Sequence, residues 1–91
     1  MYRNKTLLES ARHEACVACG ADDGTVVWAH SNQMRHGKGR GIKAHDIFGA
    51  YLCHRCHAQY DQGGIGRDEA RALFAEWWEA SLVLACNRGV I

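Results

Sequence analysis

The sequence lacks two features that would place the protein in a membrane or outside the cell. No window approaches the run of about 18 consecutive apolar residues that a membrane-spanning helix needs. Residues 1–16, MYRNKTLLESARHEAC, are too polar for a signal peptide. From these absences we expect a cytoplasmic protein with no membrane partner.

The chain is also short. Its 91 residues make one small domain, and a chain of this length buries too little surface for a large core to stabilise it alone. No linker interrupts residues 1–91, and nothing repeats except a pair of cysteines. We therefore expect one domain that needs a stabilising element in addition to its apolar core.

A strong overall charge is absent as well, because the formal net charge is only +1. The charge is distributed unevenly, however. Residues 31–56 hold five basic residues and one acid, a local charge of +4, so the other residues carry −3. Any polyanion must therefore be recognised by this segment rather than by the charge of the whole chain.

Four of the five cysteines form two C-x-x-C pairs, Cys16/Cys19 and Cys53/Cys56. In a reducing compartment this spacing favours a zinc ion over disulfides. Four thiolates would close the coordination of a structural zinc and leave no position for a reactive water. The 33 residues between the pairs exceed the usual finger spacing, so they must form a hairpin and a loop. The fifth cysteine, Cys86, lies in the apolar run LVLAC and reads as a core residue.

The remaining patterns predict an α+β fold. A capping box at Thr6 to Glu9 predicts a short helix to about Glu14, and the periodic apolar residues from Arg67 to about Asn87 predict a long C-terminal helix. Two strands are expected at Thr25–Trp28 and Asp46–Leu52, with a bulge or a close backbone approach at Gly49. A short helix should run from about Arg55 to Gln62.

Three residues form a candidate reactive site. His57 and Asp61 are spaced i, i+4, so on a helix both side chains lie on one face, where they could bind a divalent ion or simply form a surface hydrogen bond. His30 follows the first strand and could meet them, as a third metal ligand or as a general base that activates water. The alternative is that His30 has no reactive role and forms a hydrogen bond with a backbone carbonyl at the end of the strand.

A glycine-rich loop, NQMRHGKGRGIK, lies between the two predicted strands. Arg35, Lys38, Arg40 and Lys43 could bind DNA phosphates there, or the loop could be a solvated surface. His36 and His45 flank it and could contact phosphate or replace the base. Further along, Trp77 and Trp78 point about 100° apart on the long helix, so one should join the core while the other reaches a rim. A contact in the core or in a homodimer is favoured over stacking on a DNA base.

The order C-x-x-C, strand ending in AH, glycine-rich loop, strand and C-x-x-C-H-x3-D resembles the HNH endonucleases, the zinc-stapled branch of the ββα-metal or His-Me finger nucleases. The segments GIKAHD and CHRCHAQYD, followed by a long helix, are most similar to the small YbcO-like nucleases of lambdoid phages and prophages. The resemblance covers nearly the whole chain and implies a single HNH-like domain in the cytoplasm of a bacterial host cell.

The resemblance implies a role for each matching residue. His30 matches the general base, while His57 and Asp61 match the ligands of a catalytic Mg²⁺ or Mn²⁺. Cys16, Cys19, Cys53 and Cys56 match the ligands of the structural Zn²⁺. Two positions depart from the pattern: Ala29 stands where many relatives have Asp or His, and IFGAYL lacks the middle asparagine. His30 could therefore be a ligand itself, with His36, His45 or Asp46 completing the site.

Two functions follow as expectations. The first is a metal-dependent endonuclease that hydrolyses DNA phosphodiester bonds in phage recombination or DNA processing. The second is a non-catalytic zinc module that binds DNA, or phage or host recombination proteins, through the basic loop.

Overall fold

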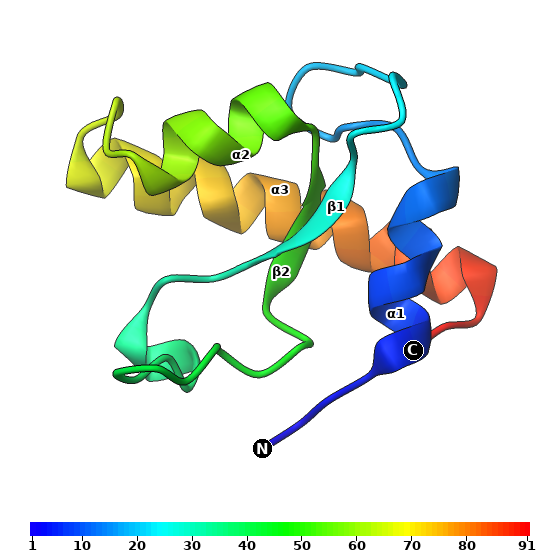
Figure 1. Cartoon of the computed structure of the whole chain (residues 1–91), viewed down its shortest axis with the longest axis horizontal. Helices are drawn as coiled ribbons and strands as arrows, with labels where there is room; N and C mark the ends of the chain where they lie inside the picture. Colours follow the sequence, from blue (N-terminus) through cyan, green and yellow to red (C-terminus); the bar gives the residue numbers. More distant parts are fainter.

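Three α-helices and a two-stranded antiparallel sheet make up the fold, which confirms the predicted α+β class (Figure 1). The computed structural model describes all 91 residues. In chain order the elements are α1 (Lys5–Ser10), the 3-10 turn η1 (Ala11–His13), β1 (Val27–His30), the 3-10 turn η2 (Met34–His36), β2 (Gly49–Leu52), α2 (His54–Asp61) and α3 (Arg67–Arg88). None of these helices has the length and apolar content needed to cross a membrane.

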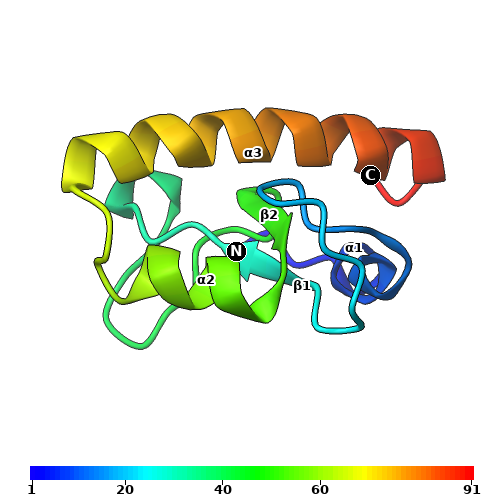
Figure 2. The same ribbon diagram turned by 90° about the horizontal axis from the view of Figure 1, so that it is seen from above.

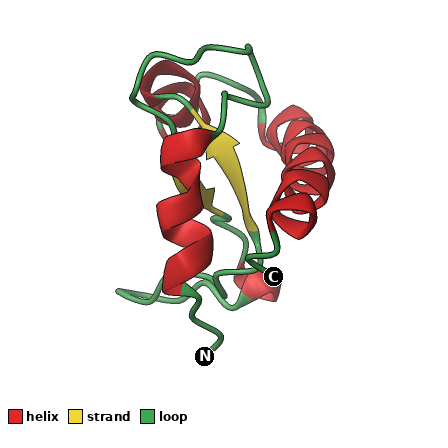
Figure 3. Cartoon of the chain, turned by 90° about the vertical axis from the view of Figure 1, so that its right-hand side faces the viewer, coloured by secondary structure: helices red, strands yellow, loops and turns green.

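The sheet lies between two layers of helices. Figure 2 shows α3 along one side of the strands and α1 and α2 along the other, and Figure 3 shows the same arrangement from the side. Because helices cover both faces, all four residues of β2 are buried. His30 is the last residue of β1, pairs with Gly49 and keeps its side chain 15% exposed. The fold thus brings His30 to the edge of the core.

Gly49 marks a close approach of the two strands, as its position in the sequence predicted. A Cβ atom at this residue would lie 2.2 Å from Nε1 of Trp28. The same indole nitrogen donates a hydrogen bond of 2.7 Å to the backbone oxygen of Asp46. The strand begins later than predicted, because residues 46–48 form a turn in which the Phe48 N–H donates to the His45 carbonyl.

The start of α1 differs from the expected capping box. The N-cap is Asn4, whose side chain accepts the Leu7 N–H at 3.0 Å, so Thr6 lies inside the helix. The Asn4 amide also donates to the carbonyl of Val90 at 2.8 Å. This contact ties the N-terminal cap to the end of the chain. It explains why the N-cap is Asn4 rather than Thr6, although both residues have good capping chemistry.

The bounds of α3 agree with the predicted long helix to within one residue at its end. Phe74, Ser81 and Ala85 are buried on its inner face, and the Ser81 hydroxyl accepts the Tyr51 N–H at 3.1 Å. The prediction for Cys86 was wrong, because this thiol lies on the exposed side of the helix. Trp77 and Trp78 are both partly buried and pack against the core.

Candidate metal centre and histidine site

The four cysteines of the two C-x-x-C pairs come together at one point, as their spacing predicted. Their sulfur atoms all lie within 4.8 Å of one another, and no pair forms a disulfide. Cys19 and Cys53 have sulfur atoms 3.7 Å apart. A regular tetrahedron of sulfurs at the usual Zn–S distance has edges of about 3.8 Å. The tetrad therefore fits a zinc ion.

Two short turns of backbone shape this centre. In the first, Gly20 has a φ of +80° and donates its N–H to the Cys16 carbonyl, while the Cys16 N–H donates to the Ala21 carbonyl. In the second, Cys53 is the N-cap of α2 and Cys56 lies in the first turn of that helix. The tetrad consequently fixes the start of α2 against the segment that precedes β1.

The pKa values around the tetrad bear on whether its cysteines are present as thiolates that can bind a cation. A hydrogen bond from the backbone of Ala21, followed by one involving Cys56, lowers the pKa of Cys19 to about 7. Burial raises the pKa of Cys56 to about 12, so this thiol ionises at neutral pH only with a cation beside it. Cys19 first, and then the charges of the other cysteines, raise the pKa of Arg55, which places a positive charge beside the tetrad.

His30 is held by a buried carboxylate from a different part of the chain. Its Nε2 lies 2.7 Å from Oδ1 of Asp46, which is 3% exposed. Burial raises the pKa of Asp46, but hydrogen bonds from His30, the Asn4 backbone and Arg3 outweigh it and keep this pKa below its ordinary value. An ionised carboxylate only accepts hydrogen bonds, so Nε2 of His30 carries a proton, and in the neutral ring Nδ1 is the nitrogen with the lone pair.

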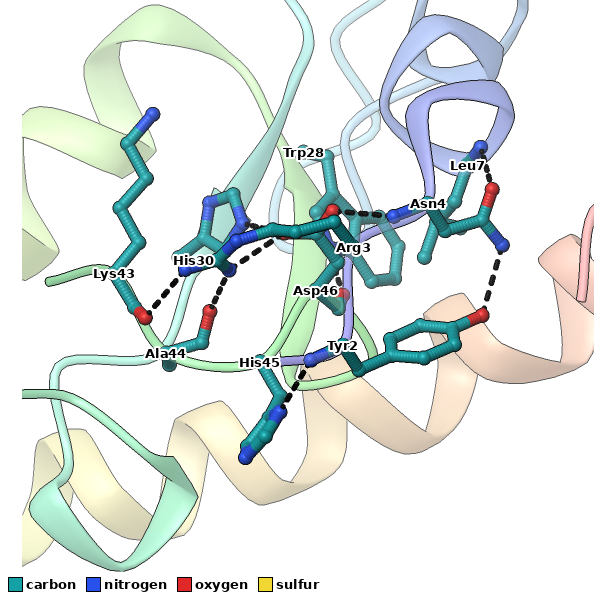
Figure 4. Close-up of polar contacts among 10 residues, drawn as sticks. All are labelled: Tyr2, Arg3, Asn4, Leu7, Trp28, His30, Lys43, Ala44, His45 and Asp46. Atoms are coloured by element: carbon teal, nitrogen blue, oxygen red, sulfur yellow. Dashed lines mark hydrogen bonds and ion pairs between the residues drawn. The ribbon is translucent and has the colours of Figure 1, made fainter.

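The N-terminal segment braces this histidine–aspartate pair (Figure 4). Arg3 donates to Oδ1 of Asp46 at 3.0 Å and also to the carbonyls of Lys43 and Ala44. The Asn4 N–H donates to Oδ2 of Asp46 at 2.6 Å. Both carboxylate oxygens are thus occupied, which fixes the orientation in which Asp46 meets His30.

His57 and Asp61 lie one turn apart on α2, and Nε2 of His57 is 2.9 Å from Oδ2 of Asp61. The two side chains are 34% and 50% exposed. Together with His30 they line one cavity of about 340 Å³. The geometric expectation that β1 and α2 direct these three residues into a common hollow therefore agrees with the structure.

Within this cavity the three residues do not form a single ligand cluster. The cysteine tetrad is the one group of three or more His, Cys, Asp or Glu side chains that are close enough to share an ion. His30 is bonded to Asp46, while His57 and Asp61 form a separate pair. Two protein ligands suit Mg²⁺, which usually keeps several waters and takes further ligands from substrate phosphates.

The basic loop divides between two places. Lys38 and Lys43 line the cavity of His30, whereas Arg35 lines a neighbouring cavity. Arg40 is exposed in the turn between Gly39 and Ile42, which form an isolated bridge.

The two histidines that flank this loop hold the structure together. His36 stacks on Phe48 with ring centroids 4.2 Å apart and bonds Ser31 through Nδ1, at 2.6 Å. Nδ1 of His45 accepts the Tyr2 N–H at 2.9 Å. Neither residue lines the cavity of His30, so neither takes the place of its base or completes a ligand set there.

The hydrogen bonds from His30 and Arg3 to Asp46 are not predicted by the sequence. Asp46 is expected there only as an alternative metal ligand, although the GIKAHD segment draws attention to it, and Arg3 is not singled out. No local signal existed for Arg3, which is 43 residues away from the carboxylate that it holds.

Comparison with models of protein families, with curated proteins and with solved structures finds no match to this chain.

Proposed function

We propose that the chain is an HNH-type, metal-dependent DNA endonuclease that hydrolyses phosphodiester bonds in phage recombination or DNA processing. The observation that carries the proposal is the shared cavity, which His30 lines together with the His57–Asp61 pair. A base and a cation site in one hollow are the two groups that hydrolysis of a phosphodiester needs.

His30 acts as the general base in this proposal. A water molecule in the cavity gives a proton to Nδ1, and its oxygen attacks phosphorus. The bond from phosphorus to one ester oxygen then breaks, and the leaving oxygen takes a proton from solvent. Asp46 keeps Nε2 protonated and stabilises the positive imidazolium that results, as the buried carboxylate does in hydrolytic triads.

His57 and Asp61 hold the catalytic ion. A bound Mg²⁺ or Mn²⁺ would neutralise charge on the scissile phosphate and on the leaving oxygen. These two side chains would give up their mutual hydrogen bond to hold the ion, and their partial exposure leaves room for water and phosphate ligands. Lys38 and Lys43, which line the same cavity, add positive charge for the phosphates on either side.

The zinc has a structural task. Four thiolates leave it no open position, so it takes no part in the reaction. Through Cys53 and Cys56 it fixes the start of α2, and His57 follows directly after Cys56. The reactive pair therefore depends on the tetrad for its position.

Plasmid cleavage with Mn²⁺ tests the proposal. His30→Ala and His57→Ala should each lower the rate by about a hundredfold or more. His54→Ala is the matched control, because His54 is exposed on the same helix and lies outside the cavity. Zinc content is measured for every variant. Cleavage by His30→Ala at the parent rate, with zinc retained, would rule out the scheme.

One observation favours a second candidate, a non-catalytic zinc module that binds DNA or recombination proteins. His57 and Asp61 satisfy each other across 2.9 Å on a solvated helix, as a surface pair does. Such a module needs one zinc per chain and no second metal. A titration that detects no Mn²⁺ or Mg²⁺ binding beyond zinc, together with salt-sensitive DNA binding, would favour this candidate.

A further inference from the structure

A second cavity, of about 570 Å³, opens beside the cavity of His30, and Asn32 and Asp61 line both. Its lining residues come from the loop after β1, the end of α2 with the loop that follows, and the first turns of α3. Its volume falls within the range of about 300–1,000 Å³ that small-molecule sites occupy. Apart from the two shared residues, its lining takes no part in the hydrolysis proposed above.

Three arginines line this cavity, and its one carboxylate is that of Asp61. Arg35, Arg67 and Arg71 form no ion pair in the structure. Arg67 and Arg71 lie one turn apart near the start of α3, where like charges repel and the helix dipole disfavours cations. Asp68 and Glu69 share this first turn but do not line the cavity. The cavity lining thus holds three cations and one carboxylate, a net positive charge that would attract an anion.

The charges of two of these arginines affect a neighbouring histidine, His36. The pKa of His36 is lowered first by burial and then by the charges of Arg35 and Arg71, which lie on different segments of the chain. Both arginines also line the cavity, so their charges lie on its wall.

The same cavity has an apolar side. Met34 lines it and is 84% exposed, which is more than any other large hydrophobic residue in the chain. Ile65 and Ala70 are partly buried beside it, and the Tyr60 hydroxyl donates to Asn32 at 3.0 Å. Apolar surface next to unpaired arginines suits a ligand with a flat aromatic part and a phosphate.

Building on the proposed endonuclease function, we propose that this second cavity binds an unpaired nucleotide of the DNA substrate. Its base lies against Met34 and Ile65, and its phosphate lies on Arg67 and Arg71. A base can enter a concave site only when it is unstacked from a duplex. Because Asp61 lines both cavities, this nucleotide is next to the scissile phosphate, and the protein selects single-stranded or branched DNA over continuous duplex.

Fluorescence anisotropy tests the charge of this site. A labelled single-stranded oligonucleotide and a blunt duplex of the same length are titrated without divalent ions, so binding is measured apart from hydrolysis. The test variant is Arg67→Gln/Arg71→Gln. The matched control is Lys5→Gln/Arg12→Gln, which removes the same charge from exposed residues at the other end of the molecule. Zinc content and circular dichroism establish that both variants fold.

The parent should bind the single strand more tightly than the duplex. Arg67→Gln/Arg71→Gln should weaken single-strand binding about tenfold and reduce the slope of log K against log salt by about 1.4, whereas the control should change affinity by less than about twofold. The inference is overturned if the two double variants behave alike, or if the parent binds duplex equally well. A parent that shows the expected pattern but never cleaves DNA would refute the nuclease and support the cavity assignment.

An abasic oligonucleotide tests the apolar side. Met34→Ser should weaken binding of the normal single strand about fivefold and leave binding of the abasic strand unchanged. Equal losses on both strands would mean that no base rests against Met34, and would overturn this part of the inference.

Discussion

Nε2 of His30 donates a hydrogen bond of 2.7 Å to Asp46, a buried carboxylate from a separate segment of the chain. This bond determines which ring nitrogen of the histidine is free to accept a proton. The N-terminal residues Arg3 and Asn4 hold the carboxylate in turn. The orientation of His30 therefore depends on contacts across more than 40 residues of sequence.

Replacing Asp46 by Asn should release this control. Because an amide offers a donor as well as an acceptor, the His30 ring would no longer be held as the Nε2–H tautomer. We expect plasmid cleavage to fall by about a hundredfold or more. Imidazole ¹⁵N chemical shifts should show one tautomer for His30 in the parent and a mixture in Asp46→Asn.

The control for this variant is Asp22→Asn, which changes an exposed acid in a loop. It should leave both the tautomer and the cleavage rate unchanged. An Asp46→Asn protein with the parent's His30 shifts would show that another contact orients the ring.

The stability of the fold should fall in acid because of Asp46. Its pKa in the folded chain lies below the ordinary value of 3.8. Such a group stabilises the fold above the unfolded pKa, and the contribution is lost as the pH falls through the lower, folded pKa. Urea unfolding from pH 6 to pH 3 should therefore show a loss in the parent below about pH 4.

Asp46→Asn has no carboxyl to titrate at this position. The difference between the urea midpoints of the parent and of Asp46→Asn should therefore narrow as the pH falls. Both proteins are measured in excess Zn²⁺, and only pH values at which metal analysis shows a loaded tetrad enter the comparison, because the fold needs the ion. A difference in midpoint that stays constant down to the lowest such pH, although the parent itself loses stability there, would contradict the lowered pKa of Asp46.

Gly49→Ala should destabilise the sheet by about 1–3 kcal/mol, because the new methyl group meets the Trp28 indole at 2.2 Å. Gly64→Ala is the control. A Cβ there has only an ordinary contact of 3.8 Å, and we expect a change within about 0.5 kcal/mol. Denaturant unfolding measures both variants. Equal values would mean that the indole moves aside without cost.

Removal of zinc should unfold the domain. In so small a chain the metal supplies stability that the core does not, so a chelator should abolish the cooperative melt and zinc should restore it. Cys53→Ser should lose the metal, whereas Cys86→Ser should keep it, since Cys86 is exposed and outside the tetrad. Metal analysis and thermal melting follow both. An unchanged melt after complete removal of the metal would refute the structural role.

The sequence predicted those features whose signals are local. The i, i+4 spacing of His57 and Asp61 on α2 and the periodic apolar face of α3 are set by the geometry of one helix. The two C-x-x-C pairs identify their own partners. By contrast, the position of the α1 cap at Asn4 depends on Val90, at the other end of the chain. The start of β2 and the role of Asp46 likewise depend on tertiary contacts that no window of sequence contains.

A crystal soaked in Mn²⁺ and read for anomalous scattering tests the central claim most directly. The account predicts zinc at the cysteine tetrad and a manganese peak within reach of Nε2 of His57 and the carboxylate of Asp61, in the cavity that His30 lines. A crystal that shows the zinc peak alone, with the hydrogen bond between His57 and Asp61 intact, would contradict the proposed nuclease.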